Sequence, residues 1–82
     1  MPEQLKEAKQ KVAGARQTIR ALESKVALIV YVARDAEEKV LSPVLCLCEQ
    51  GGVPVRYVDS MEQLGKACNI KVGAAVAAIT EE

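Results

Sequence analysis

The sequence predicts an α/β protein: a three-layer α/β/α sandwich with a small mixed four-stranded sheet, in which residues 1–82 form a single domain. Two observations lead to this expectation. Segments with helical periodicity alternate with short runs rich in β-branched residues, and this alternation favours a sheet covered by helices. Half of the residues are hydrophobic, but there are only two Tyr and no Phe or Trp, so we expect a core of aliphatic side chains.

The first half of the chain predicts two helices and a central strand. Residues 3–12 place apolar side chains on one helical face and lysines on the other, and a short extended turn at Gly14 ends this element. A second helix follows and runs to about Ser24. Residues 26–33 are almost continuously apolar and β-branched, which is typical of a central strand covered on both faces. The loop that follows, residues 34–38, lies at the carboxyl end of this strand, where α/β proteins commonly bind ligands.

A third helix is predicted through residues 40–48. We expect a break or kink where Pro43 follows Ser42, because this pair fits an N-cap and the first residue of a helix. Gly51 and Gly52 are expected to close the helix, since glycine readily adopts left-handed backbone geometry.

The last third of the chain predicts two strands on either side of a fourth helix. Ser60 and Gln63 have the spacing of a capping box, in which a hydroxyl and an amide satisfy free backbone groups at a helix start. The predicted elements here are a strand over residues 53–58, a helix over 61–67, a loop over 68–73 and a strand over 74–80.

The charges are balanced in number but unevenly distributed. The formal net charge is zero, so bulk charge does not indicate a nucleic-acid partner. Residues 6–25 carry six Lys and Arg against two Glu, whereas residues 35–62 carry six acidic residues against two basic ones. We therefore expect the two ends of the molecule to differ in sign. The scarcity of aromatic residues argues against modules that stack single-stranded bases on aromatic rings.

The sequence shows no targeting or membrane segment. No apolar signal-peptide region follows Met1, and the longest apolar run, residues 27–33, is too short to cross a bilayer. We therefore expect a cytoplasmic protein without a membrane partner.

The usual residues of an active site are missing. The sequence contains no His, which removes the commonest general base and metal ligand. Cys46 and Cys48 lie two positions apart on a predicted helix without a partner cluster, so they and Cys68 are interpreted as small buried hydrophobic residues. No glycine-rich phosphate loop is present. We expect no enzyme activity, no metal and no cofactor.

The stretch from Gly14 to Leu22 is the strongest candidate for a binding site. Gly14 suits a sharp turn, and Arg16 and Arg20 lie one helical turn apart on the same face, with Gln17 beside them. Together with free backbone N–H groups at the helix start, these side chains can contact a phosphate backbone and base edges. The alternative interpretation is an ordinary solvated helix face.

Four segments in the same order resemble the kink-turn-binding ribosomal protein family of the large-subunit seven-Ae and thirty-e type. They are GARQTIR at 14–20, VARDA at 32–36, the stretch from Ser60 to Cys68, and IKVGAA at 70–75. The resemblance covers essentially the whole chain, and its short length and Arg-Gln pair make it most similar to the bacterial YbxF-type members.

The resemblance implies a protein that binds and stabilises kink-turns. These are duplex RNAs bent sharply at an internal loop next to tandem sheared guanine–adenine pairs, in ribosomal, riboswitch or other structured RNA. It implies an RNA partner and no DNA, and we expect a monomer.

The resemblance also implies roles for individual residues. Those matching Arg16, Gln17 and Arg20 enter the widened groove at the sheared pairs, and Gly14 and Ala15 allow close approach of the backbone. A second group forms the pocket and cover for bases extruded from the loop; it consists of Glu37, Leu41, Ile70, Lys71, Val72 and Gly73.

Several alternatives stay open at this point. Glu37 has the ordinary role of a negative charge at a helix start, and Ile70 and Val72 are equally compatible with loop residues tucked into the core. Lys66 and Lys71 fit phosphate contact and plain solvation about equally well. The competing function is a small α/β protein–protein interaction module that presents its acidic face to a partner; a small-molecule-binding domain is a third.

Overall fold

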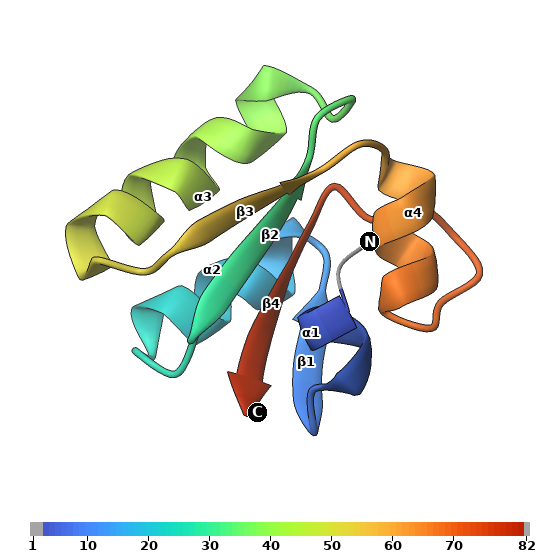
Figure 1. Cartoon of the computed structure of the whole chain (residues 1–82). Coiled ribbons are helices and arrows are strands. Elements are labelled where there is room, and N and C mark those ends of the chain that lie inside the picture. The colour runs from blue at the N-terminus through green and yellow to red at the C-terminus, as the bar shows by residue number, and fades with distance from the viewer. Residues whose placement is uncertain (1–2, 82) are drawn as a thin grey trace.

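The computed structural model describes residues 3–81 and contains four helices and four strands in strict alternation (Figure 1). Residues 1, 2 and 82 of the predicted domain lie outside the described residues. The elements are α1 (Glu3–Glu7), β1 (Gln10–Ala13), α2 (Ala15–Glu23), β2 (Ile29–Ala33), α3 (Glu38–Gly51), β3 (Val55–Val58), α4 (Met61–Ala67) and β4 (Val76–Glu81).

The four strands form one mixed sheet in the order β1-β4-β2-β3. β2 and β3 are parallel and are joined by α3, as expected for a crossover connection. β4 lies between β1 and β2 and is antiparallel to both. The predicted α/β class and mixed four-stranded sheet are therefore confirmed.

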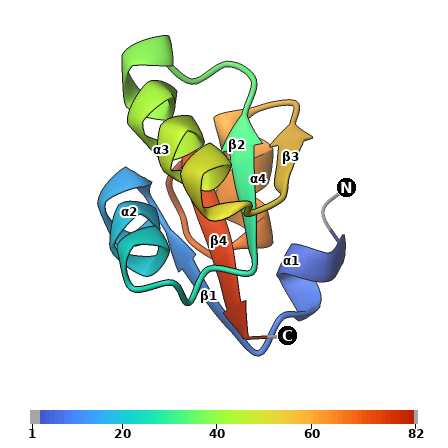
Figure 2. The same ribbon diagram turned by 90° about the vertical axis from the view of Figure 1, so that its left-hand side faces the viewer.

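The helices cover both faces of this sheet, α1 and α4 on one face and α2 and α3 on the other (Figures 1 and 2). Alternate residues of β2 enter opposite cores, because successive side chains of a strand point to opposite faces. Ile29 and Tyr31 pack with Leu64 of α4, whereas Val30 and Val32 pack with residues of α2 and α3.

The prediction of a helix as far as Val12 is wrong, because α1 ends at Glu7 and residues 10–13 form an edge strand. Val12 is paired with Ala78 of β4, so backbone pairing with the sheet replaces helical bonding here. The Lys11 ammonium donates to the carbonyl oxygens of Leu5 and Lys6, at 3.1 and 3.0 Å. It thereby closes the carboxyl end of α1.

The central strand begins at Ile29, three residues later than predicted. Lys25 has a left-handed backbone with φ 61°, and the Val26 N–H donates to the Ala21 carbonyl, so this segment closes α2. Val26 and Leu28 are 48% and 44% exposed, although the sequence assigned them to a buried strand. The last strand likewise begins at Val76 and β3 at Val55, each two residues later than predicted.

Of the break or kink predicted at Pro43, the break is wrong, since α3 continues through this residue and begins after Glu37 rather than Ser42. Proline cannot donate to the carbonyl four residues earlier, but Pro43 is exposed, where water can solvate that carbonyl. The buried side chains of Leu41 and Val44 on either side favour a continuous helix. Gly52 closes α3 with φ 67°, as predicted.

Candidate nucleic-acid interface

The segments predicted to form the site meet at one end of the sheet. The Gly14 N–H, just before α2, donates to the Val76 carbonyl at 2.8 Å. The Ala33 N–H, at the end of β2, donates to the Ala75 carbonyl at 2.9 Å. These bonds join the start of α2, the loop after β2 and the segment before β4 at the same end of the sheet (Figure 1).

The first turn of α2 presents unused backbone donors. Gly14 occupies the N-cap position with φ 96° and ψ 153°, a conformation that favours glycine, and it supplies no side-chain cap. Its carbonyl accepts from the Thr18 N–H at 3.0 Å. The N–H groups of Ala15 and the next two residues have no partner within the helix, because the first turn of any helix leaves such groups free. This end of α2 is therefore a site of partial positive charge.

Arg16, Gln17 and Arg20 are all exposed around this helix start. The first turn of α2 contains no acidic residue, and within residues 3–81 no ion pair engages either guanidinium group. On the opposite side of the helix, Ala21 and Leu22 are buried. Burial of this opposite side fixes α2 on the sheet and leaves the three polar side chains to solvent.

Glu37 and Leu41 lie at the start of α3 but in different environments. Glu37 is the N-cap residue; its carboxylate is exposed and pairs with the Lys39 ammonium at 3.4 Å. Leu41 is buried in the core with Val44, and its edge lines a groove of about 490 Å³ toward Tyr57. Glu37 is therefore accessible to a ligand, whereas Leu41 can offer only the edge of its side chain.

Residues 70–73 form an exposed loop beside α4. Ile70 is 37% exposed and Val72 is 71% exposed, so the alternative that both are tucked into the core does not hold. The loop and α4 border a pocket of about 440 Å³, lined by Asp35, Met61, Glu62, Lys66, Ile70, Lys71, Val72 and Gly73. Both lysines are exposed there, and Lys66 pairs with the Glu62 carboxylate at 3.4 Å.

Gly65 of α4 allows this loop to lie directly on the helix. The Ile70 N–H donates to the Gly65 carbonyl at 3.1 Å, and a Cβ on Gly65 would overlap the Val72 carbonyl oxygen. Gly73 also lies close to Met61, where an added Cβ would be 3.1 Å from the Met61 Cβ, a tight contact but not an overlap. The Ala74 N–H then donates to the Met61 carbonyl at 3.0 Å, so the loop is held against α4 at both of its ends.

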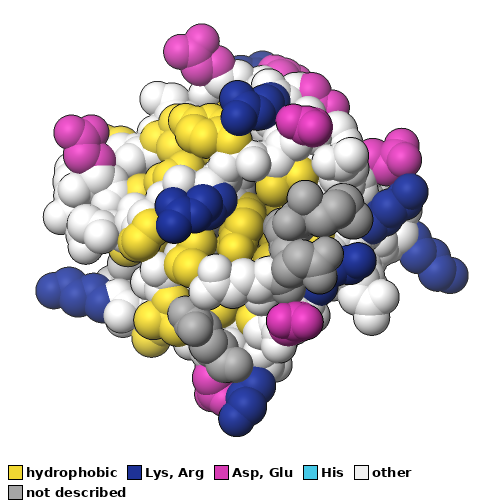
Figure 3. All heavy atoms as spheres, viewed as in Figure 1, with side chains coloured by type: hydrophobic (Ala, Val, Ile, Leu, Met, Phe, Trp, Pro, Cys, Tyr) yellow, Lys and Arg dark blue, Asp and Glu magenta, His cyan; other side chains and the backbone are white. Residues whose placement is uncertain are grey.

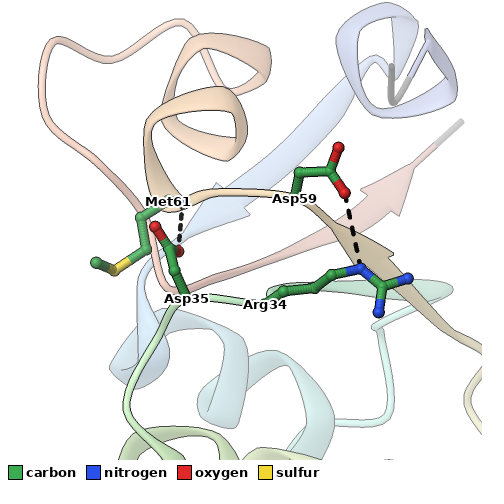
Figure 4. A network of polar contacts seen from close by, with 4 residues as sticks. All are labelled: Arg34, Asp35, Asp59 and Met61. Atoms are coloured by element: carbon green, nitrogen blue, oxygen red, sulfur yellow. Dashed lines mark hydrogen bonds and ion pairs between the residues drawn. The ribbon is translucent and has the colours of Figure 1, made fainter.

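Sequence reasoning did not single out Asp35, whose side chain points to Met61 at the start of α4 (Figure 4). Its Oδ1 accepts from the Met61 N–H at 2.8 Å, so a carboxylate from the loop after β2 caps α4. Beside it, the Arg34 side chain pairs with Asp59 at 3.7 Å and lies over the Tyr57 ring, 5.1 Å from the centroid. The sequence signal, an acidic residue after a strand, did not reveal a partner 26 positions away.

The basic residues of the first third do not all serve one surface. The Lys11 ammonium donates to carbonyl oxygens at the end of α1, so it does not belong to the surface at the start of α2. On the face shown in Figure 3, hydrophobic side chains lie over the sheet, with Lys, Arg, Asp and Glu scattered around them. At the candidate surface, the exposed positive groups include Arg16 and Arg20 of α2 and Lys71 of the 70–73 loop.

The cysteines behave differently from one another. Cys48 is buried and Cys68 is half-buried, and burial raises the pKa of both thiols, with nearby Lys11 opposing the shift at Cys68. Cys46 is exposed, so the expectation that all three are buried is wrong for this residue. Across residues 3–81, no three His, Cys, Asp or Glu side chains come together as a metal site. Nor does this part of the chain include a helix with the length and hydropathy to cross a membrane.

Comparison with known proteins identifies the family. The sequence profile of the family described as "Ribosomal protein L7Ae/L30e/S12e/Gadd45 family" matches residues 2–82. The chain belongs to this L7Ae family. The match covers almost its entire length, including every segment that meets at the end of the sheet.

Bacterial members of the L7Ae family are close in sequence. The chain is 47% identical over 77 residues to an RNA-binding protein of Geobacillus sp. strain WCH70, covering 94% of both chains. It is 50% identical over 68 residues to the RNA-binding protein YbxF of Geobacillus stearothermophilus, covering 83% of both. The resemblance to YbxF-type members is confirmed, and these relatives are named as RNA-binding proteins and not as enzymes.

Solved structures agree on the L7Ae-family fold. The 15.5 kDa RNA-binding protein of Giardia lamblia superimposes with a TM-score of 0.81 at 30% identity. That match covers 88% of this chain and 61% of the Giardia chain, so this chain spans less than two thirds of its length. A Bacillus halodurans protein of unknown function superimposes with a TM-score of 0.82 at 22% identity. The match covers 95% of this chain and 78% of the Bacillus chain, and at this identity it supports the fold alone.

Proposed function

We propose that this L7Ae-family chain is an RNA-binding protein whose recognition surface is the end of the sheet at the start of α2. The observation that carries the proposal is the exposed set of Arg16, Gln17 and Arg20 at a helix start without an acidic residue or a side-chain cap. Guanidinium and N–H groups suit phosphate, and an amide that donates and accepts suits base edges. The names of the bacterial relatives and of the Giardia protein support the same ligand.

We further propose that the RNA is a kink-turn. The deep groove of a regular RNA duplex is too narrow for side chains to read unless a bend or bulge opens it. A short helix start that carries three long polar side chains suits such an opened groove. The exposed apolar Ile70 and Val72 stand in a second segment at the same end of the sheet and suit bases extruded from the internal loop.

Each remaining candidate has a role in this proposal. Gly14 and Ala15 bring backbone N–H groups close to the RNA, and Lys71 and Gly73 complete the loop that covers the extruded bases. Glu37 supplies an exposed carboxylate that can accept from a base amine, and Leu41 supplies an apolar edge. Lys66 supplies an exposed ammonium that can contact phosphate; like Glu37, which pairs with Lys39, it forms an exposed ion pair in the free chain, with Glu62.

The test is a titration of the purified chain against a kink-turn RNA and a straight duplex of matched length and composition. We expect tight binding to the kink-turn and weak, salt-sensitive binding to the duplex. A kink-turn made of DNA serves as a second control, and we expect it to bind weakly because its helices lack 2′-hydroxyls. Equal affinity for the three nucleic acids, or none, would contradict the proposal and favour the protein-interaction alternative.

A further inference from the structure

We propose that Asp35 is a positioning residue for RNA recognition, which holds the 70–73 loop in register with the starts of α2 and α3. The inference rests on the proposed function, and it concerns a residue that need not touch the RNA. Asp35 lies in the loop after β2, two positions before Glu37, and its partner Met61 is the first residue of α4.

The first link is the bond between Asp35 and α4. The carboxylate accepts from the Met61 N–H at 2.8 Å, while the Ser60 hydroxyl accepts from the Gln63 N–H at 3.1 Å. Two of the free donors in the first turn of α4 are thus satisfied, one locally and one from a distant segment. A carboxylate at a helix start also interacts favourably with the helix dipole, so this bond is stronger than one between neutral groups.

The second link runs from Met61 to the loop. The Met61 carbonyl accepts from the Ala74 N–H at 3.0 Å, and Gly73 packs against the same residue. The Met61 N–H thus donates to Asp35, and the Met61 carbonyl accepts from the residue that follows the loop. A displacement of the first turn of α4 would therefore carry Val72 and its neighbours with it.

The Asp35 bond consequently connects two parts of the surface that lie far apart in sequence. On one side are Glu37 and the start of α3, which follow Asp35 directly in the chain. On the other side is the loop with Ile70 and Val72, which is held on α4. The nearby pair of Arg34 and Asp59 also lies between the loop after β2 and the start of α4. Both contacts are exposed, but the Arg34–Asp59 pair is separated by 3.7 Å whereas the Asp35–Met61 bond measures 2.8 Å, so we expect the ion pair to contribute little.

The experiment compares Asp35→Ala with the matched control Asp59→Ala, each titrated against a kink-turn RNA with an extruded base. We expect Asp35→Ala to lose affinity on the order of tenfold, the size of a typical coupling between sites. Asp59→Ala should bind as the wild type does. Asp35→Asn should restore most of the affinity, because its amide oxygen can still accept from Met61.

A second measurement separates positioning from general damage to the fold. Asp35→Ala combined with Val72→Ala should cost less than the sum of the two single changes, because both act through the loop. Asp35→Ala combined with Arg16→Ala should instead lower the binding free energy by the sum of the two single changes. Amide exchange at Ala74 in the free protein should be faster in Asp35→Ala and unchanged in Asp59→Ala.

Each outcome is decisive. Wild-type affinity in Asp35→Ala, an equal loss in Asp59→Ala, or additivity with Val72→Ala would overturn the positioning role while leaving the proposed function intact. Failure of the wild-type chain to bind the kink-turn would overturn the proposed function, and the positioning role with it.

Discussion

Gln17 differs from its two arginine neighbours in what it can read. Its amide donates and accepts, whereas a guanidinium only donates. We expect Gln17→Ala to cost about 1–3 kcal/mol of binding free energy against a kink-turn with sheared pairs, and to relax discrimination at those pairs. Arg20→Ala should weaken binding to every bent RNA and reduce the salt slope by about one. Arg16→Ala should be mildest, because nearby N–H groups can still contact phosphate.

Titration of each variant against kink-turns with the sheared pairs present or replaced measures these effects. Gln50→Ala is the matched control, an exposed glutamine near the carboxyl end of α3, far from the candidate surface. If Gln17→Ala lost affinity equally for both RNAs, Gln17 would not be reading the pairs.

Cys46 and Cys48 are expected to respond differently to the same replacement. Cys48→Ala should lower the free energy of unfolding by about 1 kcal/mol, because it removes a buried side chain from the α2–α3 core. Cys46→Ala should change it by less than about 0.5 kcal/mol, as is usual at exposed positions. Neither change should alter RNA affinity. Denaturant unfolding measures the free energy of unfolding of both variants. Equal losses of stability would contradict the burial of Cys48 and the exposure of Cys46.

Thiol modification gives an independent check on the two cysteines. A thiol reagent at pH 8 should label Cys46 well before Cys48, because Cys48 is buried and its raised pKa leaves less thiolate. Mass spectrometry of the labelled peptides distinguishes the sites. Labelling of Cys48 first in the folded protein would be inconsistent with its position in the core.

At the scale of elements, α4 and the 70–73 loop form one unit through Gly65. We expect Gly65→Ala to lower the free energy of unfolding by about 2 kcal/mol or more, because its Cβ would force the Val72 carbonyl away. The control is Gly51→Ala at the end of α3, where a Cβ meets only Val53 at an ordinary distance of 3.6 Å. That change should be neutral or stabilising by up to about 1 kcal/mol. Thermal unfolding compares the two, and equal effects would exclude the close approach.

The element types were largely predictable, because periodicity and end signals are local. The helix of α4 and its Ser60 cap, the closure of α3 at Gly52 and the central strand all follow from short windows of sequence. The errors arose where contacts distant in sequence override a local pattern. Val12 joins the sheet because β4 lies beside it, and α3 continues through Pro43 because its neighbours are buried.

The same distinction applies to the candidate site. The exposed position of Arg16, Gln17 and Arg20 followed from helical phase alone. Exposure of Ile70 and Val72 was left open, because nothing in the local sequence specifies where a loop lies on a helix. The bond between Asp35 and Met61 depends on the packing of the whole sheet. The roles of these candidate residues in RNA binding stay predictions until the titrations are made.

The whole molecule has no net charge, and this limits how it can bind RNA. Few cations are available at the start of α2 and in the 70–73 loop, so few counterions are released on binding. We expect the logarithm of affinity to fall only gently with the logarithm of salt concentration. Affinity measured from low to physiological salt gives the slope. A slope that corresponds to about ten or more phosphate contacts would contradict a compact surface.

We propose that the molecule stabilises a bent RNA, and the distance between the two arms of a kink-turn measures this directly. The RNA carries a fluorescence donor and acceptor on its two ends, in a buffer without divalent ions. If the chain binds the bent state preferentially, its addition shifts the population toward that state. We predict a rise in energy transfer that saturates with protein and is absent when the sheared pairs are replaced. Binding without any rise, or an equal rise with both RNAs, would contradict the proposal that the chain stabilises the bent state of a kink-turn.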